Sequence, residues 1–184
     1  KKGEANMELF AGEYAGHDVD IVLTTRELTR MMRSAHIEAE TLKDRECDPL
    51  MKEWTGAGVI FGATGGVMEA ALRSAHYLVT GQNPEPDAFK IVRSPGMDTS
   101  VIEAEVQIGA AKVRAAVVSG LGNARKLINQ IESGKVHYDF VEVMACPGGC
   151  VGGGGQPIHD GQEFAEKRAP VLYAIDKKKP IRFS

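Results

Sequence analysis

Two cysteines followed by a run of glycines are the residues whose types and spacing could do chemistry. Cys146 and Cys150 are separated by three residues, and glycines occupy positions 152 to 155. Thiolates bind iron–sulfur clusters and zinc. Glycines leave the backbone free to lie against a large group without intervening side chains. The segment is therefore predicted to hold a metal centre.

The number of cysteines limits what this chain can bind alone. The chain has three, Cys47, Cys146 and Cys150. An iron–sulfur cubane normally takes four thiolates, and a structural zinc site takes four Cys or His ligands. Cys47 lies in a polar stretch with no partner pattern. The pair at Cys146 and Cys150 is therefore either a redox dithiol or half of a metal site that another segment completes.

The alternatives fit the spacing less well. A redox dithiol is usually C-x-x-C near the start of a helix, whereas three residues intervene here. A zinc site could recruit His159, but a fourth ligand is missing, and the other histidines show no metal spacing. We favour a shared iron–sulfur site over these alternatives and over two structural thiols.

Glycine-rich turns follow two predicted strands, and ligands in open α/β sheets gather beyond the carboxyl ends of strands. The strand predicted at 138–144 precedes Cys146. The strand predicted at 58–61 precedes a turn at 62–66, and a helix is predicted over 67–79. That turn lacks the G-x-G-x-x-G order and the P-loop lysine, so it is a weak nucleotide signal. A tight strand-to-helix crossing explains it as well.

The remaining elements complete an α/β pattern. We predict strands at 19–23, 101–108 and 112–118. Helices are predicted from a capping box at Thr24 to about Ile37, over 123–133, and over 161–175, where Pro170 would interrupt or kink the helix. The fold class is therefore α/β, with a mostly parallel sheet of about four strands flanked by helices. Residues 1–184 are expected to form a single lobe.

Composition excludes several classes of protein. With 184 residues, 43% of them hydrophobic, and a net charge of -3, the chain suits one globular domain. No basic stripe interleaved with aromatics supports nucleic-acid binding. No apolar run approaches the ~20 residues of a membrane span, and three cysteines make no disulfide framework. Both ends of the sequence look internal, so we expect a piece of a longer polypeptide.

Four stretches carry a family resemblance. They are MACPGGC with GGGQP at Met144–Pro157, TGAGVIFGATGGVMEAALR at Thr55–Arg73, DIVLTTREL at Asp20–Leu28, and Lys1 to Glu4, which is similar to the end of a P-C-x-x-K-x-x-E motif. On these motifs the chain resembles the catalytic domain of iron-only (FeFe) hydrogenases, and most resembles the large subunit of the two-subunit type. The resemblance covers essentially the whole chain.

The resemblance implies a role for each matching residue. Cys146 would be a ligand of a 4Fe–4S cubane, and Cys150 the thiolate that bridges the cubane to a diiron unit. Phe61 and Met144 would shape the apolar pocket around that unit. Lys1 would donate a charge-assisted hydrogen bond to an iron-bound cyanide, and Glu4 would belong to a proton relay.

The resemblance also implies what the intact protein does. It would interconvert dihydrogen with protons and electrons at a 4Fe–4S cluster plus diiron subcluster, the H-cluster, shared with residues absent from this chain. The other cubane cysteines and the proton-relay cysteine are missing here. This chain is therefore expected to be one lobe of a two-lobed catalytic domain, inactive alone. Its partners would be the remaining lobe, a small subunit in the two-subunit type, and an electron carrier, either a ferredoxin or a c-type cytochrome.

Two other functions stay open. One is a hydrogenase-like iron–sulfur assembly or carrier protein without dihydrogen turnover, although Phe61, Met144 and the intact glycine runs argue against it. The other is a dithiol redox protein that uses Cys146 and Cys150. The sequence determines neither the direction of catalysis nor the electron carrier, and the compartment is open, with the resemblance favouring the periplasm over the cytoplasm.

Overall fold

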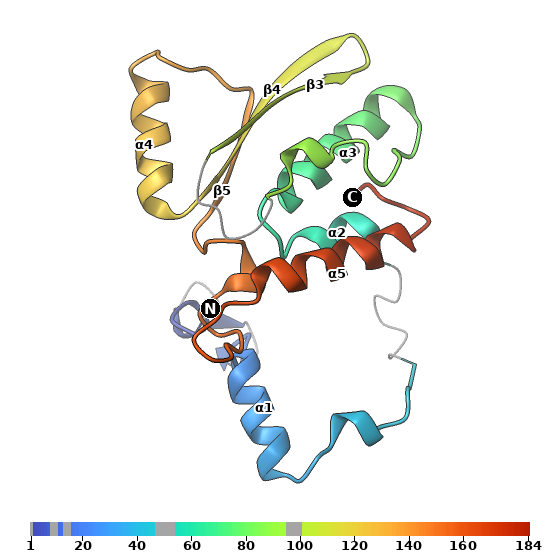
Figure 1. Cartoon of the computed structure of the whole chain (residues 1–184), viewed down its shortest axis with the longest axis vertical. Helices are drawn as coiled ribbons and strands as arrows, with labels where there is room; N and C mark the ends of the chain where they lie inside the picture. The colour runs from blue at the N-terminus through green and yellow to red at the C-terminus, as the bar shows by residue number, and fades with distance from the viewer. Residues whose placement is uncertain (1, 8–10, 13–15, 47–53, 95–100) are drawn as a thin grey trace. The chain divides into compact units, whose positions relative to one another are not determined.

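The computed structural model describes residues 2–7, 11–12, 16–46, 54–94 and 101–184 (Figure 1). The chain divides into two compact units. One comprises residues 1–46 with 155–157, and the other comprises residues 47–154 with 158–184. We predicted a single lobe over residues 1–184, and this division into two units does not test that prediction.

The first unit is built around helix α1 (Thr25–Ser34). The predicted capping box begins this helix: the hydroxyl of Thr24 accepts a hydrogen bond from the backbone N–H of Glu27, and the Glu27 carboxylate accepts one from the backbone N–H of Thr24. The unit also contains the short helices η1 (Glu4–Asn6) and η3 (Ala39–Thr41), and a small antiparallel pair, β1 (Ala11–Gly12) with β2 (Gly16–His17).

The strand predicted at 19–23 is wrong. Residues 19–24 carry no regular secondary structure. A strand needs a neighbour to take its hydrogen bonds, and in the described part of the chain no strand pairs with this segment. Its apolar residues Val19, Ile21 and Leu23 are exposed.

The second unit holds a sheet of three strands in the order β3-β4-β5. Strands β3 (Ile102–Ile108) and β4 (Ala111–Ser119) form an antiparallel hairpin, and β5 (Phe140–Met144) runs parallel to β4. The α/β class is therefore confirmed, but the expected count of about four strands is wrong, and half of the pairing is antiparallel. The short connection between β3 and β4 explains the hairpin, because parallel strands need a long crossover.

Helix α2 (Gly56–Ile60) lies where we predicted a strand at 58–61, so that prediction is also wrong. Its buried residues are Gly56, Ala57 and Ile60, which is helical rather than strand spacing. Helix α2 packs against α3 (Gly66–Thr80) and α5 (Ala165–Lys177) (Figure 1). Pro170 lies inside α5 and does not interrupt it. Helix α4 (Leu121–Glu132) and the short helices η4 (Lys90–Val92) and η5 (Cys150–Gly152) complete this unit.

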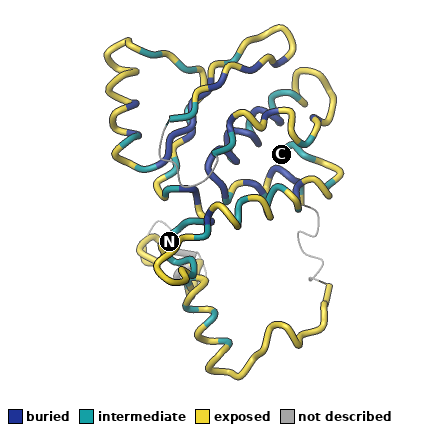
Figure 2. The backbone as a smooth tube through the Cα atoms, viewed as in Figure 1, coloured by how far each residue is buried: buried dark blue, intermediate teal, exposed yellow. Residues whose placement is uncertain are grey.

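Two hydrophobic cores lie on opposite faces of the central strand β4. Side chains on one face of β3 and β4 pack with residues of α3 and η4, including Met68, Leu72 and Val92. On the other face, Ala116 and Val118 of β4 pack with Ala124 and Leu127 of α4. Successive residues of a strand point to opposite faces, so β4 contributes to both cores. The second half of β4 is buried and dark in Figure 2. Packing on both faces holds β4 in place, and β5 is held by its hydrogen bonds to β4.

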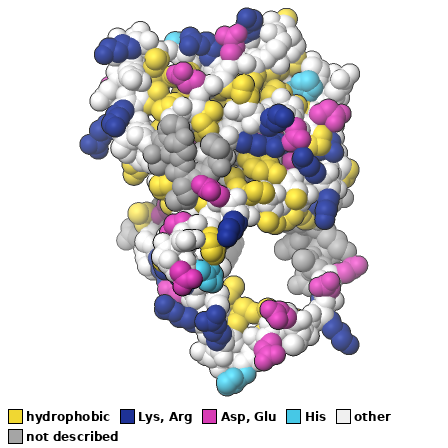
Figure 3. All heavy atoms as spheres, in the orientation of Figure 1, with side chains coloured by type: hydrophobic (Ala, Val, Ile, Leu, Met, Phe, Trp, Pro, Cys, Tyr) yellow, Lys and Arg dark blue, Asp and Glu magenta, His cyan; other side chains and the backbone are white. Residues whose placement is uncertain are grey.

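No helix in the described residues is long and apolar enough to cross a membrane. On the face drawn in Figure 3, basic and acidic side chains are interspersed rather than gathered into a basic stripe.

Candidate metal centre

The candidate cysteines follow β5 directly and are exposed to solvent. Cys146 lies two residues beyond Met144, the last residue of β5, and Cys150 begins η5. Neither forms a disulfide. The chain is tied to the end of β4 at this point: the N–H of Gly120 donates to the carbonyl of Met144 at 2.8 Å, and the hydroxyl of Ser119 donates to that of Cys146 at 3.2 Å. The position of Cys146 is therefore set by the sheet.

A tight turn leads from Cys146 toward Cys150. The N–H of Gly149 donates to the carbonyl of Cys146 at 3.0 Å, with Pro147 and Gly148 between them. Gly148 has φ of 76° and Gly149 has φ of 86°. Proline followed by a residue with positive φ is the pattern of a type II turn. Glycine at both positions lets the loop reverse without strain.

The turn at 62–66 holds the other side of this loop. The N–H of Val151 donates to the carbonyl of Gly62 at 3.0 Å, and the N–H of Thr64 donates to that of Gly148 at 3.4 Å. A Cβ atom on Gly149 would lie 2.7 Å from both the Gly62 oxygen and the Thr64 nitrogen. The two glycine-rich turns, predicted separately from the sequence, are thus in direct backbone contact.

Glu142 lies beneath this contact, and sequence reasoning missed it. Its side chain on β5 is buried, and its carboxylate accepts hydrogen bonds from the backbone N–H of Gly65 at 2.7 Å and of Met68 at 2.6 Å. Burial raises the pKa of the Glu142 carboxyl, while the backbone donors act to lower it. A lone carboxylate inside the apolar strand 140–144 was the signal that could have identified it.

Four of the predicted site residues lie in the second unit. Cys146 and Cys150 stand on the loop, Met144 is half-buried at the end of β5, and Phe61, 44% exposed, directly precedes Gly62. Glu4 is exposed in η1 of the first unit, and Lys1 lies outside the described residues. The predicted roles of Glu4 and Lys1 stay predictions.

The donor set fits part of a cluster site. In the described ranges, no group of three or more His, Cys, Asp or Glu side chains could hold a metal ion. The two exposed thiols on a fixed loop are the soft ligands that an iron–sulfur cluster takes. They supply half of the four thiolates that a cubane normally needs, so residues elsewhere in the protein would have to complete it. His159, considered as a zinc ligand, stacks on Phe164 instead.

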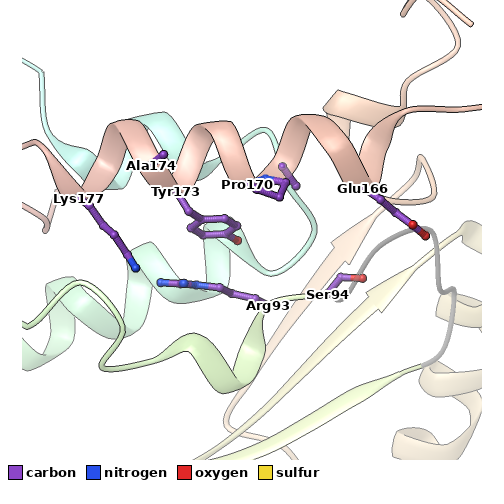
Figure 4. A pocket seen from close by; sticks show the side chains of 8 residues that line it. Arg93, Ser94, Glu166, Pro170, Tyr173, Ala174 and Lys177 are labelled. Atoms are coloured by element: carbon purple, nitrogen blue, oxygen red, sulfur yellow. The ribbon is translucent and has the colours of Figure 1, made fainter.

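A separate cavity of about 390 Å³ lies beside α5, lined in part by Arg93, Tyr173 and Lys177 (Figure 4). Its cations are already paired: Arg93 binds Glu69 and Asp87, and Lys177 binds Asp87. Arg93 also lies 4.1 Å from the centre of the Tyr173 ring. Because these charges neutralise one another, the cavity offers no converging groups comparable to the cysteine pair.

Comparison with known proteins identifies the family. The family described as "Iron only hydrogenase large subunit, C-terminal domain" matches residues 1–154. The chain is 48% identical over 168 residues to the NADP-reducing hydrogenase subunit HndD of Solidesulfovibrio fructosivorans, covering 91% of this chain and 28% of that protein. It is 47% identical over 163 residues to the periplasmic [Fe] hydrogenase large subunit of Nitratidesulfovibrio vulgaris, covering 88% and 38%.

More distant relatives share the same region. Cytosolic iron–sulfur assembly component 3 of Rattus norvegicus is 31% identical over 174 residues, covering 91% of this chain and 36% of that protein. A solved structure of a variant of [FeFe]-hydrogenase HydA1 from Chlamydomonas reinhardtii superposes with a TM-score of 0.73 at 36% identity, covering 99% of this chain and 52% of that one. The chain thus spans about a third of the curated relatives it matches and about half of the solved chain. On this evidence, the chain belongs to the iron-only hydrogenase large-subunit family and corresponds to its C-terminal domain.

Proposed function

We propose that the intact protein interconverts dihydrogen with protons and electrons, and that this chain supplies two ligands of its iron–sulfur centre. Relatives at 47–48% identity are named hydrogenases, which supports the reaction class. The observation that carries the proposal is the pair of exposed thiols on a loop held by backbone hydrogen bonds from two directions. The whole reaction needs the parts of the protein beyond this chain, so these 184 residues alone are expected to be inactive.

Each thiol has a distinct proposed role. Cys146 would hold the 4Fe–4S cubane, and Cys150 would be the thiolate between the cubane and the diiron subcluster. When bound, the cluster supplies a Lewis-acidic metal and an exit for electrons. The protein's own contribution is placement: Ser119 and Gly120 hold the backbone on one side of the loop, and Gly62 and Thr64 hold it on the other.

Other side chains have supporting roles in this proposal. Phe61 and Met144 would shape the apolar pocket around the diiron unit. Lys1 would hold the cofactor through a charge-assisted hydrogen bond, and Glu4 would belong to a proton relay. The electron partner is a ferredoxin or a c-type cytochrome.

The test is made on the full-length protein, produced without oxygen and together with its maturation enzymes. We expect bound iron and sulfide, and dihydrogen oxidation with a redox dye as acceptor. Cys146→Ser and Cys150→Ser should each reduce turnover by roughly 100-fold or more, since a metal ligand is lost. Cys47→Ser is the matched control and should leave turnover unchanged. Full-length wild-type protein without iron would end the proposal.

A second function has an observation in its favour. The relative at 31% identity is named an iron–sulfur assembly component, so a relative of this chain is named for a role other than hydrogenase. An assembly or carrier protein would bind iron and sulfide through the same cysteines but would neither consume nor produce dihydrogen. Iron analysis and the dihydrogen assay on one preparation therefore separate the two functions.

A further inference from the structure

We infer that Glu142 is a positioning residue for the cysteine loop: its carboxylate joins β5 to the turn at 62–66, and that turn holds the loop around Cys150. The link to a metal centre rests on the function proposed above. The positioning itself rests on contacts in this chain and can be tested without metal.

The first step is the bond between strand and turn. One carboxylate oxygen of Glu142 accepts from Gly65 at 2.7 Å and the other accepts from Met68 at 2.6 Å. Both donors belong to the start of α3, where backbone N–H groups have no partners within the helix. A single side chain on β5 therefore fixes the turn and the first residues of the helix together.

The second step runs from the turn to the cysteine loop. The carbonyl of Gly62 accepts a hydrogen bond from the N–H of Val151, and the N–H of Thr64 donates to the carbonyl of Gly148. The turn is therefore bonded to the loop on both sides of Cys150. The turn has little room to shift independently, because a Cβ atom on Gly65 would lie 2.0 Å from the carbonyl oxygen of Val92. Thr64 directly precedes Gly65, so a displacement of Gly65 would move Thr64 and its hydrogen bond to Gly148.

The charge of Glu142 is balanced differently from that of the other buried carboxylates. Glu69 and Asp176 both pair with Arg73. Among the described residues, no lysine, arginine or histidine forms an ion pair with Glu142, and its bonded donors are backbone amides. Amides at a helix N-terminus favour a negative charge. The contact thus depends on a carboxylate in which both oxygens accept.

Because the contact needs two acceptor oxygens, Glu142→Gln tests it directly. Glutamine has nearly the same size, but its amide has one acceptor oxygen and an NH₂ group that can only donate. Either Gly65 or Met68 would then face a donor instead of an acceptor, which leaves a buried N–H unsatisfied. The loop around Cys150 should become looser while the sheet and the helices stay in place.

The experiment measures the alkylation rates of individual cysteines in the full-length, cluster-free protein, by iodoacetamide labelling and mass spectrometry. In Glu142→Gln we expect Cys150 to react roughly 5-fold faster or more, because thiol reactivity follows access and local environment. Cys47 serves as an internal reference. Leu127→Ala, in the core between α4 and β4, is the control for general destabilisation, and Glu132→Gln, exposed on α4, is the control for loss of a carboxylate.

Two further measurements make the result decisive. Glu142→Asp retains both acceptors on a shorter side chain, so its rates should lie between those of wild type and Glu142→Gln, and it decides the matter if Glu142→Gln does not fold. Iron bound after anaerobic reconstitution should fall in Glu142→Gln and not in Glu132→Gln.

Unchanged alkylation of Cys150, or an equal increase in Leu127→Ala, would overturn the role of Glu142 whether or not iron binds. Wild-type protein that binds no iron would overturn the proposed function, while the alkylation rates would still decide the role of Glu142.

Discussion

Arg73 and Asp176 form a buried ion pair with two hydrogen bonds, which joins α3 to α5. The Nη1 and Nη2 atoms of Arg73 each lie 2.8 Å from a different carboxylate oxygen of Asp176, and neither side chain is exposed. Arg73 also donates to Glu69 at 2.7 Å. Helix α5 also packs against α2 and η5. The pair therefore helps to hold α2, α3 and α5 together, and the turn at 62–66 connects α2 to α3.

Replacing Arg73 with methionine should destabilise the protein strongly. Removing one partner of a buried pair leaves an uncompensated charge and typically costs about 3–5 kcal/mol. Urea denaturation should show this loss for Arg73→Met, and only a minor change for Arg125→Met on the exposed side of α4. The double variant with Asp176→Leu should recover part of the loss. If Arg73→Met unfolds at the same urea concentration as wild type, the pair does not stabilise the fold.

Hydrophobic periodicity predicted the long elements of the second unit and failed on short ones. The helix expected at 67–79 is α3, and the alternating pattern at 101–108 is β3. The run Gly58 to Phe61 was misread because four apolar residues do not distinguish a buried strand from a buried helix turn. What decides between them is the packing of α2 against α3 and α5, which local sequence does not reveal.

The candidate site was predictable where residue chemistry is distinctive. Cys146 and Cys150 were identified from ligand type and spacing, and the structure presents both on the surface. Glu142 was not, because its function depends on donors at Gly65 and Met68, more than seventy positions away in the chain. Such contacts form only in the tertiary structure. In the sequence, the one sign of them was an isolated carboxylate in an apolar strand.

The capping box of α1 provides a local test in the first unit. Thr24→Ala removes the acceptor for the N–H of Glu27, which lies 3.2 Å from the Thr24 hydroxyl. Loss of an N-cap residue costs about 1 kcal/mol, so amide hydrogen exchange in the first turn of α1 should accelerate by roughly 5-fold. Thr25→Ala, one residue further along and exposed, is the matched control. Equal exchange in the two variants would show that the cap contributes nothing.

The same cap should respond to acid through Glu27. The hydrogen bond from Lys2 and that from the Thr24 backbone lower the pKa of the Glu27 carboxyl from 4.5 to about 2. A group whose pKa is lowered by folding contributes stability above its unfolded pKa, and that stability is lost as the pH falls through its folded pKa. Protection of the α1 amides in wild type should therefore exceed that in Glu27→Gln at neutral pH. The difference should shrink as the pH falls from 4.5 toward 2.

High salt checks the cause of that difference. The contact between Lys2 and Glu27 is exposed, so added salt should weaken it. The hydrogen bond within the capping box should persist. A difference between wild type and Glu27→Gln that is independent of pH would contradict the assignment to the Glu27 carboxylate.

Gly149 gives the most direct test of how the cysteine loop is placed. Its φ of 86° is unfavourable for any residue with a side chain. A Cβ atom there would also lie 2.7 Å from Gly62 O and Thr64 N, both backbone atoms that cannot rotate away. Gly149→Ala should therefore push the loop off the turn at 62–66, and the full-length protein should lose most of its bound iron.

Gly154→Ala is the matched control, because a Cβ atom at Gly154 would meet nothing within 4 Å. Both variants add one methyl group to the same glycine-rich segment, so a general effect of lost flexibility would appear in both. Iron content and the alkylation rate of Cys150 should change in Gly149→Ala and stay near the wild-type values in Gly154→Ala. If the two variants bind iron equally, contact with the turn at 62–66 does not place the cysteines, and the strand β5 alone must do so.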